Sequence, residues 1–236
     1  MASSEPQREP STVSLSEFEE LASLWGLQFK WEMTGPFFRV EVRVPDKSGG
    51  NKKTVGGFKA PPMMARRRVR GTPRGLVDDE NLIGYVDGFL DKVLLDVVHL
   101  DKVEIRHPAQ QTLSPNAGRW TVGSLYGLGF LLGGYVVLQA HQRGIKKAEL
   151  LAIYDDPHMH DVLVRLYGRL GYHVVREVGE DLKDIPDRLV WGGIGTRMDA
   201  DIDSLVRNFT PYARRLIREA KMDRKEEEQL QLDSSS

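Results

Sequence analysis

The strongest constraint on the fold is an alternation of helix and strand patterns between residues 123 and 178. It begins with the glycine-rich turn GSLYGLGFLLGG and continues with apolar residues at helical spacing until Gly144. Two strand-like runs, AELLAIY and HVVREV, then flank a second amphipathic stretch that Gly171 ends. The predicted order is turn, helix, strand, helix and strand, over 123–134, 128–143, 148–154, 158–170 and 173–178. Strands that alternate with helices in this way favour a single α/β or α+β domain.

The rest of the sequence predicts elements on both sides of this region. The expected elements are a helix from the capping box of Ser16 and Glu19 to Gly26, strands over 38–44, 82–90, 99–105 and 188–195, and a last helix from Asp199 to about Lys221. On the strand 99–105, we expect Leu100, Val103 and Ile105 to face the core. The expected boundaries are a disordered tail over 1–14, one domain over 15–221 and a charged tail over 222–236.

The composition is that of an ordinary globular chain that lacks one residue type. Lys+Arg total 33 and Asp+Glu 34 in 236 residues, so the net charge is −1 and nucleic acid is not expected as a partner. Cysteine is absent, which excludes disulfides, thiolate metal sites and a cysteine nucleophile. No apolar run reaches the roughly 18 residues of a membrane span, and the N-terminus has no secretory signal. We expect a soluble intracellular protein, in the cytoplasm or, if the N-terminus is processed, inside an organelle.

The glycine-rich turn has two interpretations. Gly127 and Gly129 stand at the expected start of a helix, where main-chain N–H groups lack partners and the helix dipole is positive. A phosphate can approach such amides closely where side chains are absent. In isolation, however, this pattern more often marks a tight turn with close helix packing.

A second motif supports the phosphate-binding interpretation. The amphipathic stretch ends in Leu-Tyr-Gly-Arg-Leu-Gly-Tyr, residues 166–172. With this order of motifs the chain resembles the GCN5-related N-acetyltransferase (GNAT) superfamily, clearly over 120–180 and more weakly over 82–107. That family has a phosphate-binding loop at a helix start, then a strand, a helix ending in an LYxxLGF-like motif, and another strand. The resemblance implies a GNAT-like α/β fold with a mixed, mostly antiparallel central sheet flanked by helices.

The resemblance also implies a function and a site. The protein would be an acyl-CoA-dependent N-acetyltransferase that uses acetyl-CoA as co-substrate and acts by direct attack of an unidentified amine. Tyr167 matches the tyrosine that protonates the departing thiolate, a role that suits a phenol with a pKa of about 10. Glu104 is the candidate base, with His107 as the runner-up. The acyl-CoA-binding half would span 98–180, with contacts from Val103, Ile105, Ser124, Leu125, Tyr126, Gly127, Leu128, Gly129 and His160.

The sequence departs from the family pattern at several positions. Ser124 replaces the Arg or Gln of the loop, His160 replaces a common Asn, and Leu163 replaces a small Ala. These departures favour an alternative, a catalytically inactive GNAT-fold protein that acts as an interaction module in a larger complex. The arginine cluster at 66–74 would then hold a partner, or it is a solvated segment. In that case Tyr167 would be a core tyrosine.

Overall fold

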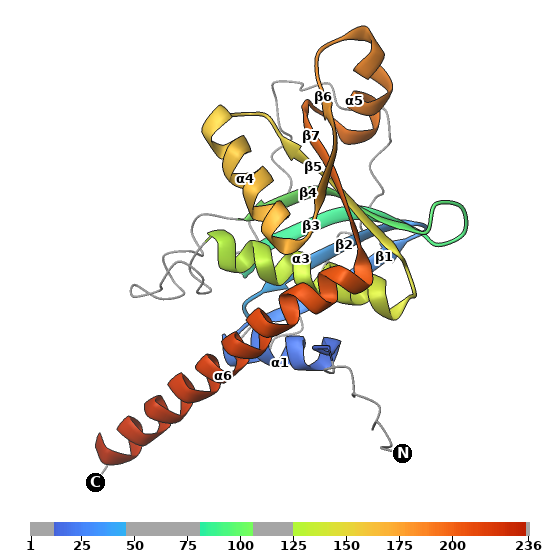
Figure 1. Cartoon of the computed structure of the whole chain (residues 1–236). Coiled ribbons are helices and arrows are strands. Elements are labelled where there is room, and N and C mark those ends of the chain that lie inside the picture. Colours follow the sequence, from blue (N-terminus) through green and yellow to red (C-terminus); the bar gives the residue numbers. More distant parts are fainter. Residues whose placement is uncertain (1–11, 46–80, 106–124, 235–236) are drawn as a thin grey trace, which may run out of the picture.

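The computed structural model describes residues 12–45, 81–105 and 125–234. Its centre is a seven-stranded sheet in the order β1-β2-β3-β4-β5-β7-β6, antiparallel throughout except for the parallel pair β4–β5. The elements are α1 (Leu15–Leu24), β1 (Gln28–Thr34), β2 (Phe37–Arg43), β3 (Leu82–Asp91), β4 (Val97–Ile105), α3 (Leu125–Gln142), β5 (Lys147–Ile153), α4 (Pro157–Leu170), β6 (His173–Val178), the 3₁₀ turn η1 (Leu182–Asp184), α5 (Ile185–Trp191), β7 (Gly195–Asp201) and α6 (Ile202–Ser234). The expected mixed, mostly antiparallel sheet flanked by helices is confirmed (Figure 1).

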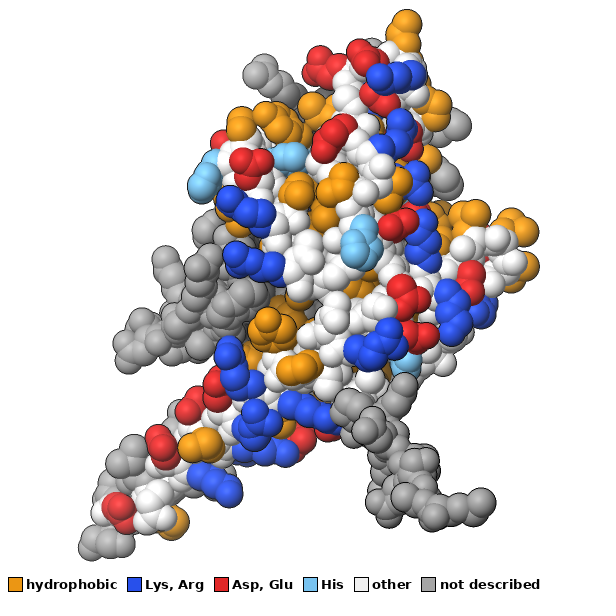
Figure 2. Space-filling model, in the orientation of Figure 1, with side chains coloured by type: hydrophobic (Ala, Val, Ile, Leu, Met, Phe, Trp, Pro, Cys, Tyr) orange, Lys and Arg blue, Asp and Glu red, His pale blue; other side chains and the backbone are white. Residues whose placement is uncertain are grey.

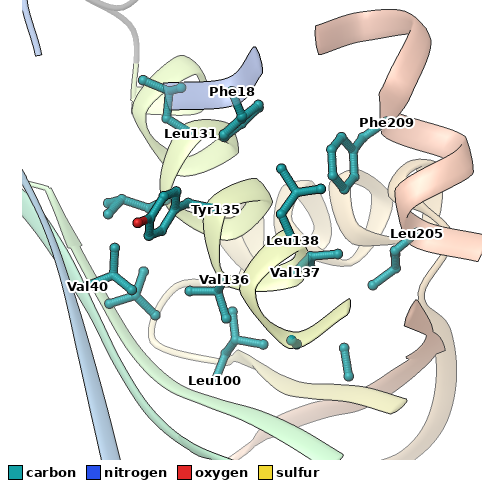
Figure 3. Close-up of a cluster of buried hydrophobic side chains, with 14 of the residues drawn as sticks. Phe18, Val40, Leu100, Leu131, Tyr135, Val136, Val137, Leu138, Leu205 and Phe209 are labelled. Carbon is teal, nitrogen blue, oxygen red and sulfur yellow. The ribbon is translucent and has the colours of Figure 1, made fainter. Parts of the chain in front are cut away.

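The core lies between the sheet and helix α3. This helix is buried along most of its length because apolar residues surround it instead of forming a single stripe. Figure 1 shows α1 and α6 beside α3, and Figure 3 shows side chains of all three helices in one cluster, among them Leu131 and Phe209. The ring of Phe18 in α1 lies 6.1 Å from that of Phe209 in α6 and 6.2 Å from that of Phe29 in β1. The first and last helices therefore complete the same core.

Close packing explains one of two adjacent glycines inside α3. A Cβ atom on Gly134 would lie 2.7 Å from Cζ of Phe18, whereas a Cβ atom on Gly133 would meet nothing within 4 Å. Glycine inside a helix costs about 1 kcal/mol relative to alanine. At Gly134 the close contact between α3 and α1 offsets this cost, while the structure gives no packing reason for Gly133.

The first helix begins two residues earlier than the sequence predicts. Ser14 is the N-cap: its Oγ accepts from the N–H of Glu17 at 3.1 Å, and the Glu17 carboxylate accepts from the N–H of Ser14 at 2.7 Å. The expected capping box of Ser16 and Glu19 is therefore wrong, although the helix type is correct. Val13 is buried, and its N–H donates to Thr210 Oγ1 at 3.1 Å. Val13 and Ser14, expected in the disordered tail, belong to the folded part.

The C-terminal segment differs most from expectation. Residues 188–195 are expected as a strand, but α5 occupies the first half of this range, with a proline in its first turn and left-handed Gly192 (φ 70°) at its end. The strand follows as β7, so Asp199 lies in a strand and α6 starts only after Asp201. The charged residues from 222 onward continue α6 to Ser234. No helix in the described ranges is long and apolar enough to cross a membrane.

Strands β4 and β5 separate after a short parallel pairing. They pair only over Val97–Leu100 and Lys147–Leu150, and both then continue without each other. Against β3, the register of β4 shifts between Leu100 and Lys102, which leaves Asp101 as an extra, bulged residue. Val103, expected to be buried, is 44% exposed because it lies beyond the last pair with β5. This divergence opens the sheet at its centre.

Candidate active site

Helix α4 covers the sheet beside this divergence and carries two residues of the predicted site. Asp156 caps the helix by accepting from the N–H of Met159, and left-handed Gly171 (φ 110°) ends it. The motif at 166–172 is therefore the end of a helix, as expected. His160 and Tyr167 are seven residues apart, about two turns, so they lie on the same side of α4.

Tyr167 is half-buried against the core, and its ring meets that of Tyr172 edge-on at 5.8 Å. Among the residues that the structure describes, its hydroxyl has no hydrogen-bond partner. Burial raises the pKa of the Tyr167 phenol. The hydroxyl is therefore protonated at neutral pH and has a proton to donate.

His160 is buried at the start of a hydrogen-bonded chain that the sequence analysis missed. Its Nε2 lies 2.9 Å from Thr196 Oγ1, and the Thr196 hydroxyl donates to the Glu177 carboxylate at 2.8 and 2.9 Å. Because the only hydroxyl proton goes to Glu177, Thr196 must accept from His160. His160 is thus held as the Nε2–H tautomer, with Nδ1 left as a hydrogen-bond acceptor when the ring is neutral.

The glycine-rich segment is helical from Leu125 onward. The first turn of α3 spans 125–128, and Gly129 is the fifth helical residue, beyond the first-turn N–H groups that lack intrahelical partners. Gly129 therefore does not lie at the start of the helix, where the sequence predicts it. An anion at this helix start would contact the first turn, residues 125–128. Leu128 is fully buried in the core, and a Cβ atom on Gly129 would lie 4.0 Å from Ile105 Cδ1. The structure thus brings the start of α3 to the end of β4.

Glu104 lies on the opposite face of β4 from Ile105. Its Oε2 accepts from the Tyr85 hydroxyl at 2.7 Å and from Lys102 Nζ at 2.6 Å. Lys102 Nζ also donates to the Tyr85 hydroxyl at 2.7 Å, which closes a three-membered network. The structure does not bring Glu104 together with Tyr167, which lies on the α4 side. Ser124, His107 and the arginine cluster at 66–74 fall outside the described residues.

The order of elements now decides the fold assignment. Helix α3 begins in the glycine-rich segment, and β5, α4 with the LYGRLGY end, and β6 follow, around a sheet whose two central parallel strands diverge. The chain has a GNAT-like fold. This confirms at the level of the fold the resemblance expected from the sequence.

Comparison with known proteins adds three distant structural likenesses. No family model and no curated protein matches the chain. A protein from Desulfovibrio desulfuricans assigned to the GNAT acetyltransferases is 13% identical with a TM-score of 0.36, over 71% of this chain and 70% of that one. A protein from Lactobacillus plantarum assigned as an N-acetyltransferase is 12% identical with a TM-score of 0.37, over 80% and 94%. The ribosomal-protein-S18-alanine N-acetyltransferase from Escherichia coli is 12% identical with a TM-score of 0.38, over 81% and 92%. At these values the likenesses carry no argument.

The other face of this GNAT-like sheet holds a second buried cluster. His99 in β4 alternates with core residues Val98 and Leu100, so its side chain points away from α3. Its Nδ1 lies 3.1 Å from Glu149 Oε1, and Arg197 donates to the other Glu149 oxygen at 3.0 Å. The ring of Trp191 in α5 lies 4.0 Å from the His99 ring. Helix α5 therefore covers the face opposite α3.

Charge balance holds this second cluster together. Burial raises the pKa of the Glu149 carboxyl, but the hydrogen bonds from His99 and Arg197 and their electrostatic attraction outweigh burial, so the pKa is lowered overall. Glu149 is therefore ionised at neutral pH. The three polar residues of this cluster come from three strands, so no local pattern in the sequence marks them.

Proposed function

We propose that the protein is an acyl-CoA-dependent N-acetyltransferase that transfers an acetyl group to an amine by direct attack. The observation that carries this proposal is Tyr167, a half-buried phenol without a hydrogen-bond partner among the described residues. It lies on the helix that packs against β5, where this strand leaves β4. The Tyr167 hydroxyl is not one of the buried side-chain atoms that lack a partner, so it is accessible to a group from outside the described chain.

The residues around the divergence fit an acyl-CoA. The start of α3 lies next to the end of β4, and neither Gly127 nor Gly129 places a side chain there. The first helical turn from Leu125 would hold phosphate oxygens, and Val103 and Ile105 would flank the pantetheine arm. His160 offers Nδ1 as an acceptor for an amide N–H. When bound, acetyl-CoA supplies an acyl group activated as a thioester.

Two residues on opposite faces of the sheet would transfer protons in this reaction, one as a donor and one as an acceptor. Tyr167, on the α4 side, donates a proton to the leaving sulfur, and its raised pKa keeps that proton in place beforehand. Glu104, on the other side, accepts the proton of the incoming amine, directly or through a water. Tyr85 and Lys102 hold the Glu104 carboxylate by two hydrogen bonds. The amine would then approach from the face that α5 partly covers.

Calorimetry with acetyl-CoA, followed by a turnover assay, tests the proposal. We expect a dissociation constant in the micromolar range. Tyr167→Phe should lower kcat about a hundredfold or more while the affinity for acetyl-CoA changes less than about threefold. Tyr212→Phe, an exposed tyrosine on α6, is the matched control and should match the wild type. Because the chain has no cysteine, a thiol reagent reports only the released CoA. No binding of acetyl-CoA, or an unchanged kcat for Tyr167→Phe, would refute this mechanism.

A second function is favoured by an apolar tip on the β3–β4 hairpin. Val93, Leu94 and Leu95 are 90%, 85% and 63% exposed. Three consecutive exposed apolar residues suit a contact with another protein. The protein would then be a catalytically inactive interaction module. An absence of acetyl-CoA binding, together with a partner that Leu94→Asp releases, would decide for this function.

A further inference from the structure

A pocket of about 340 Å³ opens beside the end of β5. It is lined by Ile185, Arg188, Leu189, Gly192, Gly193 and Ile194. Figure 2 shows hydrophobic side chains gathered over this end of the molecule, around α4, β6 and α5.

Arg188 is the charged residue of the pocket, and its neighbours leave it unpaired. Asp184 accepts from Arg176 at 3.2 Å and from the N–H of Gly179 at 3.0 Å. Asp187 pairs with the same Arg176 and lies 4.0 Å from Arg197. Within the described part of the chain, Arg188 has no ion pair, and its buried Nε has no hydrogen-bond partner. The terminal NH₂ groups of Arg188 have no partner among the described residues and are not covered like Nε, so they are open to an acceptor from outside the chain.

The pocket lies where the two central strands diverge. The N–H of Tyr154, the residue after β5, donates to the Ile194 carbonyl at 2.9 Å, and a Cβ atom on Gly193 would lie 3.3 Å from Ile153 Cδ1. Trp191, about one turn after Arg188 on α5, packs on His99 of β4. Arg188 is thus placed on the face from which the amine would approach.

We propose that this pocket binds a carboxylate of the acyl acceptor, with the Arg188 guanidinium donating to both oxygens. The planar fork of an arginine matches a carboxylate in two parallel hydrogen bonds. Ile185 and Leu189 give the pocket apolar walls suited to a methylene chain between the carboxylate and the amine. The assignment of the ligand as acyl acceptor rests on the proposed function, whereas carboxylate binding does not. The carboxylate could belong to a free amino acid or to an acidic side chain near a peptide N-terminus.

Direct binding is tested first, without acetyl-CoA. The ¹H–¹⁵N resonance of Arg188 Nε is followed while ω-amino acids of two to six carbons, or the corresponding amides, are added. We expect the acids to shift this resonance and the amides to leave it unchanged. Arg188→Gln should weaken binding of the best acid about ten- to a hundredfold, and Arg188→Lys should recover part of the loss. Arg218→Gln, an exposed arginine on α6, is the matched control. Equal responses to acids and amides, no response to either, or equal effects of the two Gln variants overturn the proposal.

Acetyl transfer is tested second, by release of CoA. The same acids and amides serve as acceptors, together with peptides beginning Ala-Asp and Ala-Asn. The acids or the Ala-Asp peptide should have a KM about ten- to a hundredfold lower than the matched neutral compound, and Arg188→Gln should remove this difference. Preference for the amino acids or for the peptide identifies the source of the carboxylate. Binding of acids without transfer to any amine supports the pocket and refutes the proposed function. Acetyl transfer with the same KM for acidic and neutral acceptors refutes carboxylate binding in the pocket and supports the proposed function.

Discussion

The two faces of the sheet each bury a histidine, and the two are held in different ways. On the α4 face, His160 donates to a neutral hydroxyl, and the carboxylate of Glu177 lies one hydrogen bond further away. On the α5 face, His99 contacts the carboxylate of Glu149 directly, and Arg197 offsets its charge. The first arrangement selects a tautomer, and the nearest carboxylate to the ring is that of the exposed Asp161, 3.9 Å from Nδ1. The second is an ion cluster whose members depend on one another.

Burial reinforces this difference. Glu149 is only 8% exposed at the centre of the sheet, whereas Glu177 lies on the exposed edge strand β6. Water can replace the partner of an edge residue but cannot reach the centre of the sheet. A glutamate therefore orients a histidine on the α4 face, whereas on the α5 face a glutamate contributes to the stability of the fold.

Removing the two carboxylates in turn tests this comparison and should give the largest effect. Glu149→Ala leaves the buried His99 without its acceptor and the half-buried Arg197 with only Asp187, 4.0 Å away, so we expect a loss of about 3 kcal/mol in the free energy of unfolding. Glu177→Ala should cost only about 1 kcal/mol, because Glu177 is exposed on the edge strand β6 and water can enter the space that its carboxylate leaves. Urea unfolding monitored by tryptophan fluorescence measures both. Equal losses in the two variants would contradict the distinction.

Thr196 offers a smaller and more specific test of the α4 face. Thr196→Val keeps the shape but removes the group that bridges His160 and Glu177, so stability should fall by about 1–3 kcal/mol. Thr196→Ser keeps the hydroxyl and should retain the Nε2–H tautomer of His160. The ¹⁵N shifts of the imidazole report the tautomer in each variant. If His160 keeps the same tautomer in Thr196→Val, the chain through Thr196 does not set it.

The smallest effect is expected in the pH dependence of the α5 face. The folded protein lowers the pKa of Glu149 below its ordinary value of 4.5, so the unfolded chain takes up the proton first as the pH falls. The stabilisation by Glu149 is therefore complete above pH 4.5 and is lost as the pH falls below it. Unfolding curves of the wild type and Glu149→Gln should converge over that range. Curves that stay parallel would show that Glu149 does not titrate as proposed.

The sequence predicted those parts of the fold whose signals are local. The helices α3 and α4 have long periodic patterns and end in Gly144 and Gly171, both of which adopt a positive φ. Strand β1 was missed, although Gly35 (φ 60°) marks its hairpin to β2. The sequence predicts a strand in the second half of α5 because the seven residues of this helix are too few to show a helical period.

The site was less predictable than the fold. Tyr167 and His160 were found through a motif, but their surroundings depend on distant residues. Thr196 lies 36 residues after His160, and Glu149 lies 50 residues after His99. Such contacts arise only from strand order and register, for which a single sequence gives no local signal. The lack of an ion pair at Arg188 also depends on distant residues, because Arg176 and Arg197 are the arginines that pair with Asp184 and Asp187 in the described structure.

The link between the first and last helices has a consequence for synthesis. Val13 and Thr210, joined by a hydrogen bond, are 197 residues apart, and the Phe18 ring contacts Phe209 in the same layer. On the ribosome, α1 is therefore made long before its final partners exist. Until α6 emerges, the apolar side of α1 lacks part of its covering and is a surface that chaperones can bind. Folding of this chain should accordingly finish late, with the docking of its last helix.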